Sequence, residues 1–446
     1  MIKKRYNYLI VLTLTVSLIL LCGAVLDPRE GALLARSVNL VPFSPAASRT
    51  ALAREPYVQR VQSDSLEIHW RTDGEIECQL VYGDPGDLTD PIRAQADGDS
   101  QWVRLDSLEA DQDISYQVVD SNGAPISRVF QTHTAPALDF DGEIKLAVLG
   151  DSGEPYRMLW NVHAGKPQTE ILEQIERANP DLVVHTGDLV YNHGEWENYD
   201  PLYFKPYGTL LARIPIYPCL GNHDIMTDHG APYFANQFLP EVSERFPERY
   251  YSADYGNVHL ISLDSSYLET LTNPEEKKEI LSVEDAEAIR QEQIEWLRED
   301  LAATPKNQWI IVFFHHPLYS TARTPRTVQN RLDISHKDWL PLLEEAGVDL
   351  VLSGHEHLYE RFHPILHGKR DDANGIPYVV TGGGGGDVRE FEVPASELTA
   401  RRVPMTHHFV LLTLKGEQLL LDAIDRDGKV IDSWERTRAR TGASQE

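Results

Sequence analysis

Five short segments of this sequence place metal-binding side chains directly after apolar runs. Gly187-Asp188 follows the apolar run Leu182-Val183-Val184, and Tyr191 lies three residues further along. An apolar run that breaks at a glycine is typical of a buried strand that ends in a loop. A carboxylate has two oxygens and can contact two cations, and a phenol in the same loop can bind one of them. We therefore expect Asp188 to bridge two metal ions.

The other segments that close apolar runs are Gly150-Asp151, Gly221-Asn222-His223-Asp224, His315-His316-Pro317 and Gly354-His355-Glu356-His357. Taken singly, the first three are also typical of turns, helix caps or a pair of one buried and one exposed histidine. Two imidazoles two residues apart after a buried strand are rarely needed for packing. All five segments in one chain favour a metal site.

The side chains at these strand ends give a set of candidate ligands: Asp151, Asp188, Tyr191, Asn222, His315, His355 and His357. With one shared carboxylate, they provide the roughly eight protein contacts that two ions need. The oxygen donors Asp151, Asp188 and Tyr191, together with His357, suit a trivalent iron. Asn222, His315 and His355, which share Asp188, suit a divalent Zn, Mn or Fe ion.

The elements that must position these residues alternate between strands and helices after the linker 137–142. Apolar runs alternate with stretches of helical pattern at 169–178, 284–302 and 340–346. This order indicates mostly parallel strands, and open α/β sheets bind ligands beyond the carboxyl ends of their strands. The glycine run 382–386 would let the backbone approach the site closely.

Residues 55–136 have a different pattern, with short alternating strands separated by Gly, Asp and Pro. Leu66, Ile68 and Trp70 fall on one face of such a strand. Glu67 and His69 fall on the other face, and we expect His69 to face solvent. Strands at this spacing indicate an antiparallel β-sandwich.

The ends and the composition of the chain bear on its location and partners. The formal net charge of −28 over 446 residues disfavours nucleic acid as a partner. Lys3-Lys4-Arg5 precedes uncharged residues from Leu9 to Leu26, so residues 1–26 are a signal peptide or an N-terminal membrane anchor. We expect an exported protein in the periplasm, at the cell surface or secreted. Residues 27–54 read as a linker and 436–446 as a tail.

The ligand segments, in this order, resemble the motifs of the calcineurin-like metallophosphoesterases: Asp151-x-Gly153, Gly187-Asp188-x-x-Tyr191, Gly221 to Asp224, Val312-x-x-His315 and Gly354-His355-x-His357. Tyr191 narrows the resemblance to the purple acid phosphatases. The resemblance implies an α/β sandwich of two mixed β-sheets flanked by helices over residues 143–435. It also implies a fibronectin type III-like sandwich over 55–136, although Ile114 stands where that module usually has a tyrosine.

The resemblance carries expectations about mechanism. In that family the tyrosine binds ferric iron as a phenolate, which implies the same role for Tyr191. It implies an acid phosphatase that hydrolyses small phosphate monoesters by attack of a metal-bound hydroxide. His223 would hydrogen-bond the phosphate or protonate the leaving group, and Asp224 would orient His223.

One segment departs from that family, whose members carry histidines shortly after the Val-x-x-His strand. This chain has Arg323 and Arg326 there and no histidine before His336. Either arginine is a candidate to bind a phosphate oxygen. Two other functions stay open: a phosphodiesterase that acts on nucleotides or other diesters, and a non-catalytic cell-surface binding protein.

Overall fold

A computed structural model of the chain describes residues 52–438 except 85, 89–90, 159–160, 278–279 and 324, without the side chains of 156–163 and 325–329. The predicted signal or anchor segment, nearly all of the linker and most of the tail lie outside these residues. Among the described residues, no helix combines the length and the apolar character needed to cross a membrane.

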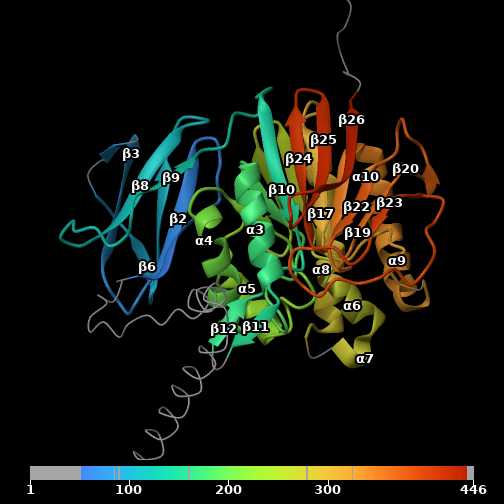
Figure 1. The fold of residues 1–446 in the computed structure, drawn as a ribbon, viewed down its shortest axis with the longest axis horizontal. Coiled ribbons are helices and arrows are strands. Elements are labelled where there is room, and N and C mark those ends of the chain that lie inside the picture. The colour runs from blue at the N-terminus through green and yellow to red at the C-terminus, as the bar shows by residue number, and fades with distance from the viewer. Residues whose placement is uncertain are drawn as a thin grey trace, which may run out of the picture. The chain divides into compact units, whose positions relative to one another are not determined.

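The N-terminal part is all-β and consists of two antiparallel sheets (Figure 1). The first sheet has the order β1 (Leu52–Gln59), β2 (Ser65–Thr72), β7 (Ser100–Asp106) and β6 (Gln95–Asp97). The second has the order β4 (Asp87–Leu88), β3 (Cys78–Asp84), β8 (Asp113–Asp120) and β9 (Phe130–His133), and β5 (Ile92–Arg93) also pairs with β3. Leu66, Ile68 and Trp70 alternate along β2 into the core, which confirms the predicted β-sandwich.

The opposite face of β2 is buried too, so the prediction that His69 faces solvent was wrong. The His69 side chain is buried, its ring stacks on Phe238 at a centroid distance of 4.0 Å, and Nε2 lies 3.0 Å from the Glu67 carboxylate. The Tyr116 hydroxyl donates a hydrogen bond to the backbone carbonyl of Ala212 over 2.6 Å. Tyr116 lies on β8 of the other sheet, and both Phe238 and Ala212 belong to the α/β part of the chain. Phe238 therefore covers the His69 face of β2.

From residue 143 the chain forms two larger mixed sheets. The six-stranded sheet has the order β14 (Ile216–Pro218), β13 (Leu182–His185), β10 (Glu143–Leu149), β24 (His408–Lys415), β25 (Gln418–Asp425) and β26 (Val430–Thr437). The seven-stranded sheet has the order β15 (Tyr251–Tyr255), β16 (Val258–Ser262), β17 (Trp309–Phe314), β18 (Leu350–Ser353), β22 (Tyr378–Thr381), β19 (Tyr359–Phe362) and β23 (Thr399–Val403). Two hairpins are separate, β11 (Pro155–Met158) with β12 (Asn161–Ala164) and β20 (Ile365–Leu366) with β21 (Lys369–Arg370). The strands β10, β13 and β14 are parallel to one another, as are β16, β17, β18 and β22.

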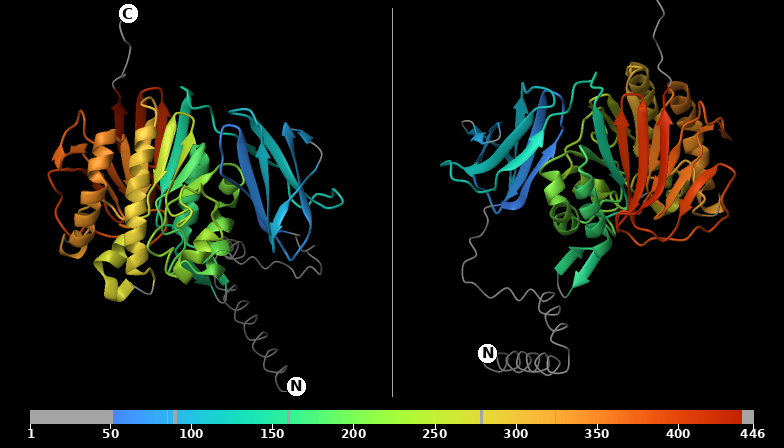
Figure 2. Two further views of the ribbon diagram at one scale, coloured as in Figure 1. Left: turned by 180° about the vertical axis from the view of Figure 1, so that it is seen from behind. Right: turned by 45° about the horizontal axis from the view of Figure 1, so that its top comes forward.

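Helices cover the outer faces of the two sheets. The α-helices are α3 (Lys166–Ala178), α4 (Lys205–Leu211), α5 (Ala231–Phe234), α6 (Tyr267–Thr272), α7 (Pro274–Lys277), α8 (Val283–Ala303), α9 (Pro325–Asp338) and α10 (Leu340–Ala346). Shorter helical turns are η1 (Trp196–Asn198), η2 (Asp200–Phe204) and η3 (Asp228–Gly230). In Figure 2, seen from behind, α8 in yellow and the orange helices lie over the seven-stranded sheet.

Strand β17 shows why the sheets stack as two inner layers. Ile311 and Phe313 belong to the core between the sheets, whereas Ile310, Val312 and Phe314 belong to the core under the helices. A strand buried on both faces reads as a continuous apolar run, which is typical of parallel sheets covered on both sides. The predicted α/β sandwich of two mixed sheets flanked by helices is therefore confirmed.

The helices begin and end at residues that the sequence marks locally. Helix α8 begins after Ser282, whose hydroxyl accepts a hydrogen bond from the backbone N–H of Asp285 over 3.0 Å. Helix α10 ends at Gly347, which adopts the left-handed conformation that glycine tolerates. Helix α9 was not predicted. It begins at Pro325, because proline is favoured in the first turn of a helix.

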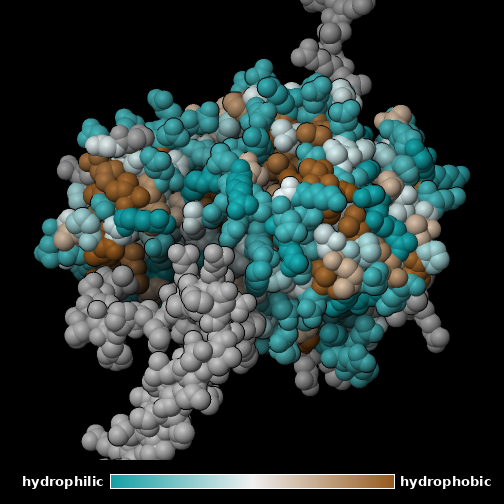
Figure 3. Space-filling view, in the orientation of Figure 1, coloured by the Kyte–Doolittle hydropathy of each residue, from teal (hydrophilic) through white to brown (hydrophobic). Residues whose placement is uncertain are grey.

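Figure 3 shows a mainly hydrophilic face, in line with the acidic composition. Apolar residues gather over the N-terminal sandwich and over strands β24 to β26, where Leu420 and Val430 are exposed. The candidate metal ligands are not part of this exposed surface, because each of them is at most 8% exposed.

Candidate metal centre

The predicted ligands come together at the carboxyl ends of both large sheets. The six-stranded sheet contributes Asp151 after β10, Asp188 and Tyr191 after β13, and Asn222 after β14. The seven-stranded sheet contributes His315 after β17, and His355 and His357 after β18. Parallel strands end at one edge of a sheet, so residues far apart in the sequence meet there. The group of side chains exists only because the two sheets stack with these edges together.

One set of donors surrounds the Tyr191 hydroxyl. Its oxygen lies 3.1 Å from Oδ1 of Asp151, 3.0 Å from Oδ2 of Asp188 and 3.0 Å from Nε2 of His357. Nδ1 of His357 donates to the backbone carbonyl of Asp387 over 2.8 Å. This hydrogen bond leaves Nε2 of the neutral ring without a hydrogen and free to bind a cation.

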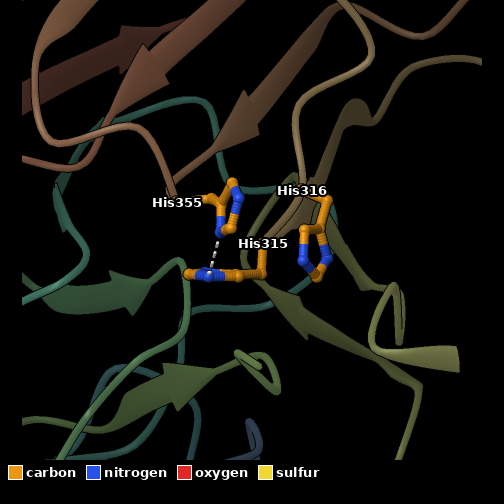
Figure 4. A group of neighbouring side chains, drawn as sticks. All are labelled: His315, His316 and His355. Carbon is orange, nitrogen blue, oxygen red and sulfur yellow. Dashed lines mark hydrogen bonds between the residues drawn. The ribbon is translucent and has the colours of Figure 1, made fainter. Parts of the chain in front are cut away.

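A second set of donors lies beside the first. Oδ1 of Asn222 lies 3.1 Å from Nε2 of His315 and 2.9 Å from Nδ1 of His355. The two imidazole nitrogens are 3.2 Å apart, as the dashed line in Figure 4 marks. Nε2 of His315 also lies 3.2 Å from Oδ2 of Asp188, the oxygen that contacts Tyr191. One carboxylate oxygen is therefore common to both sets.

Three of these residues have a backbone conformation that L-amino acids seldom adopt. The φ angles of Asp151, Asp188 and His355 are 58°, 54° and 67°. Neighbouring groups hold these conformations, since the backbone N–H of His355 donates to Oδ2 of Asp151 over 2.9 Å and that of Asp151 donates to the Gly187 carbonyl over 3.0 Å. Strained residues of this kind cluster at functional sites because the conformation aims a side chain.

The backbone of the glycine run 382–386 packs against the loop that carries Asp151, a member of the first donor set. The N–H of Gly384 donates to the Gly150 carbonyl over 2.9 Å, and that of Gly386 donates to the Asp151 carbonyl over 2.7 Å. A methyl group on Gly384 would lie 2.5 Å from the Gly150 oxygen, and one on Gly386 would lie 2.9 Å from Cε1 of His357. Only glycine lets the backbone approach the ligand-bearing loops this closely.

The two donor sets concentrate buried negative charge. Asp151 and Asp188 are both fully buried or nearly so. Burial raises the pKa of Asp188, but the adjacent His315 ring outweighs it and holds this pKa below its usual range. Burial lowers the pKa of His315, but the Asp188 carboxylate raises it to about 10. His315 therefore carries the compensating positive charge when no cation does.

The Tyr191 hydroxyl responds to the same charges. Burial, together with the Asp151 and Asp188 carboxylates, raises the pKa of Tyr191 well above its usual value. Tyr191 is thus a neutral phenol in the metal-free protein, and a cation is needed to make it a phenolate.

The chemistry of the two sets fits metal ions. Asp151, Asp188 and His315 each bring a ligand atom within 4.8 Å of the others, and His315, His316 and His355 do the same. A set rich in hard oxygen donors suits a trivalent iron, whereas imidazoles with one amide and one carboxylate oxygen suit a divalent ion.

His223 lies at the exposed side of this centre. Its side chain is 29% exposed, and Nε2 lies 4.0 Å from Oδ2 of Asp188. Its Nδ1 is hydrogen-bonded to the backbone carbonyl of Asn192. This contact fixes the ring and presents Nε2 towards the donor sets and solvent.

Asp224 does not orient His223, which corrects the prediction. The buried Asp224 carboxylate accepts hydrogen bonds from the backbone N–H groups of Asp188, Leu189 and Gly221 over 2.8 to 2.9 Å. Among the described residues, none of its hydrogen bonds reaches the His223 side chain. Asp224 instead ties the loop that carries Asp188 to the loop that carries Asn222.

The predicted arginines stand apart from the two donor sets. Nε of Arg323 donates to the Glu356 carboxylate over 3.0 Å, and the Arg323 side chain is 31% exposed. The Arg326 side chain lies outside the described part of the structure.

Two residues beside His355 were not singled out from the sequence. The ring of His316 is buried, and its centroid lies 4.4 Å from that of His355. Nη1 of Arg331, on α9, lies 3.4 Å from Nε2 of His355. The sequence signal for His316 was the apolar run that leads into both histidines. Arg331 had no such signal, because its position depends on the unpredicted helix.

Comparisons with known proteins agree with this architecture. Residues 144–359 match the calcineurin-like phosphoesterase family. The chain is 30% identical to "Purple acid phosphatase 21" of Arabidopsis thaliana over 58% of this chain and 54% of that protein. It is 27% identical to "Phosphoenolpyruvate phosphatase" of Allium cepa over 63% of this chain and 56% of that protein. The chain thus spans little more than half the length of these two relatives.

A solved structure shows the same fold. The purple acid phosphatase from yellow lupin (Lupinus luteus) seeds superposes with a TM-score of 0.70 at 20% identity, over 86% of this chain and 74% of that chain. The stacked sheets with ligands at their carboxyl ends define a calcineurin-like phosphoesterase domain. Proteins named purple acid phosphatase are among the homologues of this chain, and one of them shares its fold.

Proposed function

We propose that this protein is a dinuclear-metal hydrolase of small phosphate monoesters, of the acid phosphatase type. The observation that carries the proposal is the shared oxygen of Asp188, which lies 3.0 Å from the Tyr191 hydroxyl and 3.2 Å from Nε2 of His315. Asp151, Asp188, Tyr191 and His357 would hold Fe(III), and Asp188, Asn222, His315 and His355 would hold a divalent Zn, Mn or Fe ion. Two such cations neutralise charge on phosphate oxygens and make water more acidic.

The side chains of this chain have separate roles in the proposed reaction. Asp151, Asp188 and the other members of the two donor sets would hold the cations, and the positive charge of the cations would replace that of His315 beside Asp188. His223 with a hydrogen on both ring nitrogens would donate the Nε2 hydrogen to the departing alkoxide oxygen, because it is the imidazole at the exposed side of the centre. Asp224 would keep the Asp188 and Asn222 loops at their spacing.

Two relatives support the choice of phosphate esters. "Purple acid phosphatase 21" and "Phosphoenolpyruvate phosphatase" are both named for phosphatase activity. The N-terminal Lys3-Lys4-Arg5 and the apolar run to Leu26 support export of the protein, with the segment either cleaved or kept as an anchor.

A test compares three outcomes on one preparation. The protein is loaded with iron and zinc, and hydrolysis of an aryl phosphate monoester and of a bis-aryl phosphate diester is measured from pH 4 to pH 8. We expect turnover of the monoester to exceed that of the diester. Preference for the diester would favour a phosphodiesterase instead. Absence of both activities with both metals bound would favour a non-catalytic binding protein.

A further inference from the structure

A narrow pocket lies behind His355, on the side of the ring that faces away from the two donor sets. His355 presents Nδ1 to Asn222 and His315, whereas Nε2 lies 3.4 Å from Nη1 of Arg331. The pocket is lined by His316, Ser320, Arg323, Arg331, Ser335 and Glu356, together with neighbouring apolar side chains. Arg331 lines the pocket and contacts His355, so the pocket lies next to the candidate metal centre.

His316 offers this pocket an unused hydrogen-bond donor. The Ser265 hydroxyl oxygen accepts from the His316 backbone N–H over 3.0 Å and lies 2.9 Å from Nδ1 of the same residue. The hydroxyl hydrogen is thus available to Nδ1, and the neutral ring carries its own hydrogen on Nε2. This Nε2 is buried and has no hydrogen-bond partner among the described residues. Glu269 lies 3.6 Å away, too far for a good hydrogen bond.

Two guanidinium groups add positive charge to the same pocket. Nε of Arg323 contacts Glu356 at 3.0 Å, and Nη1 of Arg331 contacts Glu269 at the longer distance of 3.5 Å. The Arg331 side chain is only 13% exposed. A guanidinium has five N–H donors, and a single carboxylate contact of this kind cannot satisfy all of them.

Metal binding by His355 would increase the surplus of donors. If Nδ1 of His355 binds a cation, the ring hydrogen moves to Nε2, which faces the Arg331 guanidinium. His355, His316 and Arg331 would then direct N–H groups into one space, and donors cannot satisfy one another. A buried donor without an acceptor costs about 1–3 kcal/mol, so this space favours an anionic acceptor.

We propose that this pocket binds a second anionic group, a carboxylate or a phosphate, of a substrate whose phosphate ester lies at the metal centre. The substrate class is therefore phosphate monoesters that carry another acidic group close to the ester. The choice of substrate rests on the proposed function, whereas binding of an anion by Arg323, Arg331 and His316 needs no metal.

Calorimetric titration of the metal-free full-length protein with inorganic phosphate tests the pocket by itself. We expect binding that is at least about tenfold weaker in Arg331→Gln and in Arg323→Gln, because each change removes a charge-assisted contact. Arg245→Gln is the matched control, since Arg245 is exposed and pairs with Asp285 at 3.1 Å. No phosphate binding, or equal binding by all four proteins, would overturn the proposal. Thermal melting checks the variants, and Arg323→Gln, the more exposed site, carries the test if Arg331→Gln does not fold.

A variant that is expected to bind phosphate more tightly gives a second check by the same titration. Glu269→Gln removes a negative charge that lies 3.5 Å from Arg331 and 3.6 Å from His316. We expect tighter phosphate binding in this variant. Weaker binding would mean that Glu269 organises the arginine rather than competes with an anion, and would contradict the proposal.

Turnover by the metal-loaded protein then identifies the substrate. Phosphoglycolate and ethylene glycol bisphosphate are compared with ethylene glycol monophosphate, which lacks the second anionic group. We expect a kcat/KM ratio of at least about ten in favour of one acidic substrate, and a ratio near one in Arg331→Gln but not in Arg245→Gln. The better acidic substrate shows whether the group is a carboxylate or a phosphate. Equal kcat/KM for all three in the unchanged protein would overturn the substrate class. Anion binding without any turnover would instead overturn the proposed hydrolase and leave the anion site standing.

Discussion

The hydroxyl oxygen of Tyr191 lies 3.0 Å from Oδ2 of Asp188, three residues earlier in the same loop. That carboxylate oxygen also lies 3.2 Å from Nε2 of His315, which comes from the other large sheet. The oxygen therefore belongs to two donor sets that are otherwise separate. A change at Asp188 affects both sets, whereas a change at Tyr191 or Asn222 affects one.

Asp188→Asn is expected to weaken the binding of both metal ions, and Asn222→Ala only that of the divalent ion. Changes to groups that merely support a ligand typically cost 10- to 100-fold in metal affinity, so loss of a direct ligand should cost at least about tenfold. Elemental analysis after dialysis against a weak chelator measures iron and zinc separately. Selective loss of one metal in Asp188→Asn would contradict the bridge.

Tyr191→Phe is expected to remove any visible absorption band of the iron-loaded protein while the fold persists. Only the hydroxyl is lost, and with it the phenolate that would bind iron. Tyr207→Phe is the control, because Tyr207 is a buried tyrosine whose hydroxyl donates to Ser152 rather than to a ligand. A band that survives in Tyr191→Phe would assign the colour to another group.

His223→Ala is expected to keep both metals and to lower kcat about 100- to 10,000-fold, the usual contribution of a positioned acid or base. His223 is partly exposed and hydrogen-bonds through Nδ1 to a backbone carbonyl, so its removal leaves the donor sets in place. His193→Ala, at a side chain that is 63% exposed, should leave kcat unchanged. Equal kcat in both variants would remove His223 from the mechanism.

Gly384→Ala is expected to destabilise the protein by about 1–3 kcal/mol and to loosen iron, since the new methyl group would lie 2.5 Å from the Gly150 oxygen beside Asp151. Gly208→Ala in helix α4 meets open space and should stabilise the protein by about 0.5–1 kcal/mol. Urea unfolding and iron content measure the two effects. Full iron content in a destabilised Gly384→Ala would show that the glycine run supports the fold but not the ligands.

Stability is expected to fall between pH 6.5 and pH 9 because of His259. Burial lowers the pKa of His259, but Asp254 at 2.8 Å and Asp300 at 2.9 Å raise it from 6.5 to about 9. A folded-state pKa above the unfolded one gives stability that is complete below the unfolded pKa and is lost as the pH rises through the folded pKa. The shift corresponds to about 3 kcal/mol at most.

Urea unfolding at pH 6, 7.5 and 9.5 measures this loss, and His259→Gln is the comparison. The variant should be less stable at pH 6 and should lose less stability than the unchanged protein on going to pH 9.5. Parallel curves for the two proteins would show that another group causes the pH dependence.

The strand-end positions of the candidate ligands could be predicted because each depends on a local pattern. Asp151, Asp188 and His315 each follow an apolar run that ends abruptly, and such runs form strands whatever surrounds them. Helices α8 and α10 followed from the helical pattern of 284–302 and 340–346, within one residue of their observed bounds.

The wrong predictions for His69 and Asp224 and the missed position of Arg331 have a different cause. In each case the position of the side chain depends on the elements that pack against it. His69 alternates like a solvent-facing residue, but a second domain covers that face of its strand. Asp224 neighbours His223 in the sequence, yet its carboxylate points to the backbone of the Asp188 loop. Arg331 acquires its place beside His355 only because α9 packs against α6 and α10.

By itself, the sequence determined which side chains stand at the strand ends and in which order, because residue type and apolar spacing are properties of short segments. Only the tertiary structure decided that one oxygen of Asp188 serves two donor sets and that His316, Arg323 and Arg331 face one pocket. These relationships depend on the stacking of two sheets and on the docking of a helix, and such long-range packing sets distances that no local pattern encodes.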